Sequence, residues 1–242
     1  MIPYPLHIFS LFSIVLGIVC ALWVAADVIR RPPYMTVMAF VWPLTALFGS
    51  LLLTAFYLRH GRARPLPERE GKAHTDNGHG NDTPFPVAVA KGALHCGAGC
   101  SLGDIIAEIL AFAFPATLLF FGYPGLFSDR VFAAWGLDFV LAFALGILFQ
   151  YYAIVPMRNL KPLRGLWAAV KADALSLISW QIGMYGFMAI AHFWLFGHVL
   201  QAQLEPNSAE FWFMMQLAMV AGFVTAYPTN WWLIRARIKE RM

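Results

Sequence analysis

Residues 95–108 read His-Cys-Gly-Ala-Gly-Cys-Ser-Leu-Gly-Asp-Ile-Ile-Ala-Glu, and they bring two of the three cysteines, a histidine and two carboxylates into the start of an apolar segment. On a helix, residues four apart lie on one side and drift slowly around the axis. Four side chains of this stretch form such a row: Cys96, Cys100, Asp104 and Glu108. The row must face protein or water, because residues 109–121 are apolar enough for a membrane interior.

The composition indicates a protein that crosses a membrane several times. Hydrophobic residues make up 60% of the chain, charged residues make up 12%, and the mean hydropathy is +0.64; these values are far from those of soluble domains. A bilayer span needs about 20 mostly apolar residues. Six windows satisfy this: 5–27, 35–58, 99–122, 131–155, 166–196 and 211–234. The predicted fold is all-α, a polytopic bundle of six transmembrane helices.

The same pattern divides the chain into three parts. Residues 1–58 hold the first two spans, and residues 95–242 form a four-helix core that begins with the His-Cys-x-x-x-Cys motif. Residues 59–94 read as a flexible loop rich in Gly, Pro and charge, with His60, His74 and His79. These sparse histidines are either solvated spacers or a loose metal-binding site.

The distribution of Lys and Arg predicts that both termini and the 59–94 loop lie in the cytoplasm. Positive charge is retained on the cytoplasmic side of a membrane. With six spans, thirteen Lys and Arg residues fall on the side of the termini, and only Arg30, Arg31 and Arg130 fall on the other. Lys171 lies inside the fifth span. The net charge of +4 therefore reflects topology and attraction to anionic lipid, and it needs no nucleic acid to explain it.

Several polar residues fall at similar depths in the predicted spans, which indicates an internal cavity. In this topology the cytoplasmic third of the membrane holds Cys96, Cys100, Asp104, Gln150, Asp173 and Asn230. Glu108 lies nearer the midplane. An ionised carboxylate at the centre of a span costs about 3 kcal/mol on insertion scales. We therefore expect Asp104, Glu108 and Asp173 to line one polar cavity that opens toward the cytoplasm, with Gln150 and Asn230 nearby.

The residue types in the row indicate metal chemistry. Thiolates and imidazole favour Cu(I) and Zn(II), whereas carboxylates suit Zn(II), Mn(II) or protons. At about 1.5 Å per residue, Cys96 and Glu108 are about 18 Å apart along a straight helix and cannot bind the same ion. The prediction is a membrane protein that binds or transports a metal cation, copper before zinc, at two successive stations. The candidate metal ligands are His95, Cys96 and Cys100 at the first station, Asp104 and Glu108 at the second, and Asp173.

Three other interpretations stay open. The first is that the row is packed core alone, since Gly99 and Gly103 form a small-xxx-small pattern and cysteine is itself a small packing residue. The second is an oxidoreductase in which two thiols exchange electrons with a quinone or haem, with His192 or His198 as a cofactor ligand. A reducing cytoplasm near the thiols disfavours an oxidising periplasmic disulfide role. A structural subunit of a membrane complex is the third.

Further motifs along the chain carry a family resemblance, together with residues 95–108. They are residues 137–139, 146–151, 156–158, 171–177, 183–186, 228–235 and 238–242. With these motifs the chain resembles an uncharacterised bacterial multipass membrane family catalogued as domain of unknown function 4396. The resemblance implies a protein of the bacterial inner membrane without an established activity, and the family's His-bearing loop favours metal handling. The expected partners are the lipid bilayer, a metal ion, and a second copy or another membrane subunit.

Overall fold

The computed structural model describes residues 2–33, 35–63, 83–158 and 161–241, and this part of the chain is built from helices and turns. The long helices are α1 (Tyr4–Arg30), α2 (Met38–His60), α5 (Phe85–Ala113), α6 (Arg130–Arg158), α7 (Pro162–Ala189) and α8 (Ala209–Arg235). A 3₁₀ helix, η1 (Pro115–Phe121), follows α5, and a π-helical segment, η2 (Ile190–Val199), continues α7. Within the described ranges, six helical segments are long and apolar enough to cross a membrane, which confirms the predicted class of fold.

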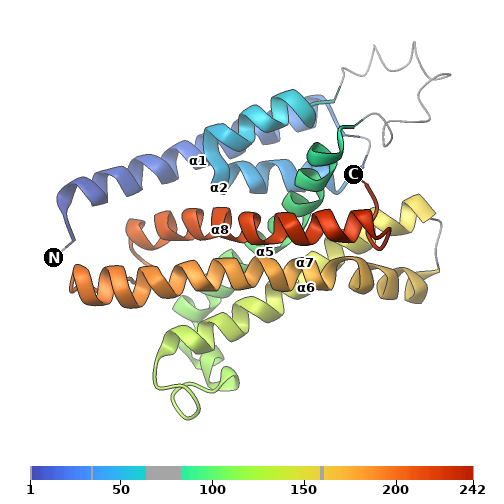
Figure 1. Cartoon of the computed structure of the whole chain (residues 1–242). Helices are drawn as coiled ribbons and strands as arrows, with labels where there is room; N and C mark the ends of the chain where they lie inside the picture. The colour runs from blue at the N-terminus through green and yellow to red at the C-terminus, as the bar shows by residue number, and fades with distance from the viewer. Residues whose placement is uncertain (1, 34, 64–82, 159–160, 242) are drawn as a thin grey trace.

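Helix α5 lies at the centre of the bundle and contacts α2, α6, α7 and α8 (Figure 1). Its close approach to α6 depends on glycine. A Cβ atom on Gly99 would collide with the backbone of Gly146, and one on Gly103 would collide with the backbone of Ala142. The small-xxx-small pattern therefore does serve packing, because it lets two helix backbones touch. The same helix presents its polar row to α6 and α7.

Helix α5 begins earlier than the hydropathy window predicted. The prediction placed residues 59–94 in a loop and the start of the third span near residue 99, whereas residues 85–94 are helical and mostly buried. This stretch is apolar apart from Lys91, and the prolines at positions 84 and 86 suit a helix start. His60 ends α2, with its ring 5.0 Å from that of Phe56. The predictions for His74 and His79 lie outside the described residues.

Helix α2 does not run straight through the bundle but folds back at Ser50, where φ is 44° and ψ is −125°. A straight helix would place Trp42 and Tyr57 about 22 Å apart, whereas their ring centroids are 5.4 Å apart. Figure 1 shows the two halves of α2 side by side. Residues 38–49 rise only about 18 Å, less than the hydrocarbon core of about 30 Å. Helix α2 is therefore a hairpin whose two halves lie side by side and whose two ends lie at the same end of the bundle.

The hairpin is fixed at both of its ends. At the open end, Asp27 of α1 accepts from Tyr57 at 2.9 Å and from Arg62 at 2.8 and 2.9 Å. At the tip, Gln216 of α8 donates to the Leu47 carbonyl at 2.9 Å. This bond supplies a partner for a carbonyl that the helix break leaves free, which a membrane interior requires.

Because α2 returns to its own side, the two termini lie at opposite ends of the bundle (Figure 1). Near the N-terminus, His7 Nδ1 is 2.7 Å from Glu210 Oε1 at the start of α8. Beyond the other end of α8, Lys239 donates to the Gly92 carbonyl. The 27 residues of α8 rise about 40 Å between these contacts. The prediction that both termini lie on one side of the membrane counted α2 as a full crossing, whereas in the described bundle the chain ends lie at opposite ends.

Candidate functional site

The row on α5 is buried, as the sequence predicted. Cys96 and Cys100 are 0% exposed, Asp104 is 1% exposed and Glu108 is 5% exposed. The row does not form a continuous path. It divides into two polar groups, one at each end of the bundle, with Trp180 of α7 packed between them.

The first group, here called the tail cluster, surrounds the ammonium of Lys239, which follows α8. Its members are Cys96, Asp173, Ser176, Asn230 and Lys239. Lys239 Nζ lies 2.6 Å from Asp173 Oδ1, 2.8 Å from Asn230 Oδ1, 3.0 Å from Cys96 Sγ and 3.1 Å from the Gly92 carbonyl oxygen. The side chains of Lys239 and Asp173 are both 0% exposed. A fully buried lysine therefore contacts four acceptor atoms from three helices.

A helix-capping turn brings Lys239 back into the bundle. Ile238 N donates to Leu233 O and Arg237 N donates to Ile234 O, which is the bond pattern of a Schellman motif. Arg237 takes the left-handed position of that motif, with φ 57°, where glycine is the usual residue. Burial lowers the pKa of Lys239, but the contacts with Asp173 and Cys96 outweigh burial and raise this pKa above its usual value. The ammonium is therefore charged.

Hydrogen bonds join the other members of the tail cluster. The Cys96 thiol donates to Asp173 Oδ1 at 2.8 Å and lies 3.0 Å from Ser176 Oγ. Asn230 Nδ2 donates to Ser176 Oγ at 2.5 Å and to the Ala226 carbonyl at 2.8 Å. Asp173 and Asn230 thus lie together as predicted. Their lysine partner was missed, because cations that follow tryptophans at the end of a span are typical of an anchor at the lipid headgroups.

The second group, here called the acid cluster, holds three carboxyl groups: Asp104 and Glu108 of α5 and Asp138 of α6. Asp104 and Asp138 are each 1% exposed, and within the described residues their four carboxyl oxygens have no hydrogen-bond partner. The three groups act on one another electrostatically. The Gln181 amide of α7 approaches Asp104 without forming a well-shaped hydrogen bond.

Asp138 was not among the predicted site residues, although a signal for it was present. It is an acid within the apolar window 131–155, and an ionisable residue inside a span is functional by default. The prediction used it only as part of a family motif. Asp173 belongs to the tail cluster instead, so the single cavity expected for Asp104, Glu108 and Asp173 is divided in two.

A pocket of about 250 Å³ reaches the acid cluster from the end of the bundle opposite the tail cluster. Its lining includes Glu108, Arg130 and His192. Arg130 donates to the Ala111 carbonyl at 2.8 Å and acts electrostatically on Glu108. His192 Nε2 lies 3.9 Å from Asp129 Oδ2 at the rim. The opening therefore differs from the predicted one, which faced the side of the C-terminus.

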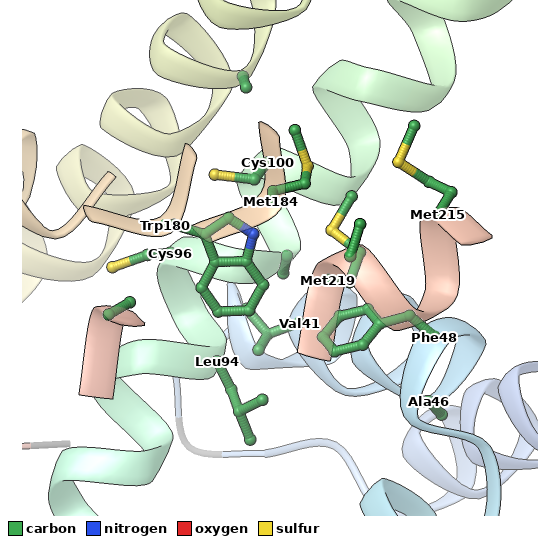
Figure 2. Close-up of a cluster of buried hydrophobic side chains, with 14 of the residues drawn as sticks. Val41, Ala46, Phe48, Leu94, Cys96, Cys100, Trp180, Met184, Met215 and Met219 are labelled. Atoms are coloured by element: carbon green, nitrogen blue, oxygen red, sulfur yellow. The ribbon is translucent and has the colours of Figure 1, made fainter. Parts of the chain in front are cut away.

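The predicted first metal station is not assembled as expected. His95 is buried against α6, with its ring centroid 6.3 Å from that of Phe149, and Cys96 is bonded within the tail cluster. Cys100 lies in the main apolar core, and Figure 2 shows it one turn along α5 from Cys96, beside the Trp180 indole. Both cysteines are free thiols. Within the described ranges, no three His, Cys, Asp or Glu side chains converge as metal ligands.

The remaining predicted residues lie apart from both clusters. His192 lines the pocket, whereas His198, the alternative haem ligand, is exposed on η2. Gln150 is buried on α6 and makes no hydrogen bond to either cluster within the described part of the chain.

Trp180 lies between the two clusters, in a space that two glycines leave open. A Cβ on Gly97 of α5 or on Gly222 of α8 would collide with its indole, which is 0% exposed. Figure 2 shows the ring surrounded by Met184, Met219 and Phe48. This apolar layer separates the tail cluster from the acid cluster.

Comparison with protein families gives a match that spans both clusters. A model of the family described as Domain of unknown function (DUF4396) matches residues 87–239, from the first turn of α5 to Lys239. No curated protein and no solved structure matches the chain. The chain therefore belongs to the family described as Domain of unknown function (DUF4396).

Proposed function

We propose that this protein binds and transports a cation, a proton or a divalent metal ion, through the acid cluster. The observation that carries the proposal is the burial of three carboxyl groups inside membrane-spanning helices, two of them without a hydrogen-bond partner in the described part of the chain. Ionisable residues in such positions mark ion and proton pathways.

Charge compensation supports a cation as the ligand. Three ionised carboxylates in a low-dielectric interior repel one another and lose their hydration, so the cluster must hold protons or a metal cation. Arg130 near Glu108 supplies one positive charge and is itself bonded to the Ala111 carbonyl. The acid cluster therefore lacks enough fixed positive charge of its own to balance three acids.

The distribution of Lys and Arg over the folded chain indicates which end of the bundle faces the cytoplasm. With α2 as a hairpin, Arg30 and Arg31 join the end of the bundle that carries the C-terminus. Of the 14 Lys and Arg residues in the described ranges, twelve belong to this end, one, Arg130, belongs to the other, and Lys171 lies within α7. In the bacterial inner membrane this end is cytoplasmic. The acid cluster then opens to the outside, and the N-terminus is outside as well.

The ligand types favour protons, Zn(II) or Mn(II) over copper. Carboxylates suit hard and borderline cations, whereas Cu(I) selects soft sulfur ligands. The copper station predicted from the cysteines needs two converging thiolates, and Cys100 lies in the apolar core while Cys96 is hydrogen-bonded to Asp173. Copper transport is for that reason the less favoured form of the proposal.

Carbodiimide labelling tests cation binding by the acid cluster. A hydrophobic carbodiimide reacts with protonated carboxyl groups in apolar surroundings, so we expect peptide mass mapping to find the label on Asp104, Glu108 or Asp138. Zn²⁺ or Mn²⁺ should suppress the labelling if it binds there. Glu205, an exposed acid at the rim of the same pocket, is the internal control and should stay unlabelled. Labelling that is absent from the cluster would contradict the proposal, and labelling that neither metal ion suppresses would leave the proton as the cation.

A further inference from the structure

The atoms around the Lys239 ammonium form a shell that suits a metal cation. It is built from one carboxylate oxygen, one amide oxygen, one thiol sulfur and one backbone carbonyl oxygen, at 2.6–3.1 Å from Nζ. Each is an electron-pair donor of a type that binds metal ions in proteins. The shell is therefore defined by four ligand atoms, and a positive charge already lies at its centre.

Part of the segment that delivers this charge is exposed. Arg235, Ala236 and Arg237 are exposed. The Arg241 guanidinium lies 5.1 Å from the centroid of the Phe85 ring. A cation–π contact at an exposed site contributes only about 0.5–1 kcal/mol. The tail can therefore leave the bundle without disrupting a transmembrane helix, because it lies beyond the end of α8.

We propose that Cys96, Asp173, Asn230 and the Gly92 carbonyl form a metal-cation site, and that Lys239 is a tethered cation that fills this site and closes the cytoplasmic end of the protein. The site takes a borderline divalent ion of the Zn(II) class, because one sulfur with three oxygens suits Zn(II) better than Cu(I). This deepens the proposed function, on which it rests for its role as the cytoplasmic end of the cation path.

The geometry requires only a small adjustment for this exchange. Zn–S and Zn–O bonds measure about 2.3 and 2.0–2.2 Å, so the four ligand atoms must close in by about half an ångström or more. Three of them are on side chains that can rotate. When Zn²⁺ replaces the ammonium, the Cys96 thiol releases its proton to water and binds as the thiolate. The metal and the thiolate together carry one positive charge, as the ammonium does, so Asp173 retains a counter-ion in both states.

The test is Zn²⁺ binding by the full chain in detergent, measured by equilibrium dialysis and elemental analysis. Lys239→Met keeps the apolar stem and removes the charge, and we expect it to gain one Zn²⁺ per chain over the parent. The gain should be lost in the Lys239→Met, Asp173→Asn double variant. Lys239→Arg, which keeps the charge, should show no gain. Equal binding by the Lys239→Met variant and the parent would overturn the proposal.

Two further measurements separate loss of the metal site from unfolding of the variant and from failure of the acid cluster. If Lys239→Met unfolds without metal, recovery of its thermal transition on addition of Zn²⁺ supports the proposal, and no recovery overturns it. The gain in binding should also persist when Asp104 and Asp138 are both replaced by Asn, because those residues belong to the other cluster. A failure of the acid cluster as a transport site would therefore leave this result unchanged.

Discussion

Lys239 and Asp173 form an ion pair whose side chains are hidden from solvent, and its energetics depend on both partners. The attraction between buried charges largely offsets their loss of hydration, so the net stabilisation of such a pair is small. Removing one partner leaves an uncompensated charge and costs about 3–5 kcal/mol. The pair therefore adds little net stability, but it strongly favours the one position of the tail in which Lys239 contacts Asp173.

Asp173→Asn should lower the stability of the protein markedly, by about 3–5 kcal/mol, because the Lys239 ammonium loses its counter-ion. The measurement is thermal unfolding in detergent. Asp129→Asn is the matched control, since the Asp129 side chain is 40% exposed and asparagine keeps the oxygen that accepts from Val131 N. An Asp173→Asn protein that unfolds at the temperature of the parent would show that Lys239 is not charged and buried as described.

Single residues were predictable where their position within a span determines their environment. An acid or amide inside an apolar window must face protein, and this placed Asp173 beside Asn230. Lys239 was not predictable in the same way, because its burial depends on the left-handed conformation of Arg237. That conformation is typical of glycine, so an arginine gives no signal of the turn.

At the scale of elements, the re-entrant α2 decides how the rest of the chain is oriented. Hydropathy measures how apolar a window is but does not show whether the chain reverses within it. The window 35–58 was therefore predicted to be a full crossing. The local signals were Pro43, a proline inside the helix of the kind that causes kinks, and the pair Gly49 and Ser50, where the chain reverses. The reversal itself is set by tertiary contacts, above all the bond between Gln216 and the Leu47 carbonyl.

Gln216→Leu should destabilise the hairpin by about 1–3 kcal/mol, because it leaves the Leu47 carbonyl without its partner in an apolar environment. Thermal unfolding in detergent measures the effect. Ser13→Ala is the control: Ser13 donates to Gln216 Oε1 at 2.7 Å, and its removal leaves the bond to Leu47 in place. Equal stability of the Gln216→Leu protein and the parent would mean that the tip does not depend on this bond.

At the scale of the whole molecule, the hairpin makes the number of full crossings odd. In the described part of the chain, α2 turns back while the other five long helices run along the bundle, so the two chain ends lie at opposite ends of it. The sequence predicted the helical class, the central place of residues 95–108 and the strong charge asymmetry. It did not predict whether the number of crossings is odd or even, because a count of apolar windows does not show which window turns back.

Reporter fusions test this topology in cells. A reporter fused after Met242 should be active in the cytoplasm, and one fused before Met1 should report the outside. A fusion in the 201–207 segment, which precedes α8, should agree with the N-terminal fusion. If both termini report the cytoplasm, then α2 is a full crossing in the membrane and the acid cluster opens toward a different compartment.

Cation flux through the acid cluster is the most direct test of function. Purified protein in liposomes should admit protons, Zn²⁺ or Mn²⁺, detected by indicators trapped inside. Asp104→Asn with Asp138→Asn should reduce the flux by about tenfold or more, equivalent to at least about 1.4 kcal/mol, whereas Glu205→Gln should leave it unchanged. Flux no faster than in empty liposomes for all three cations, or equal flux in the double variant and the parent, would contradict a transport role for Asp104, Glu108 and Asp138.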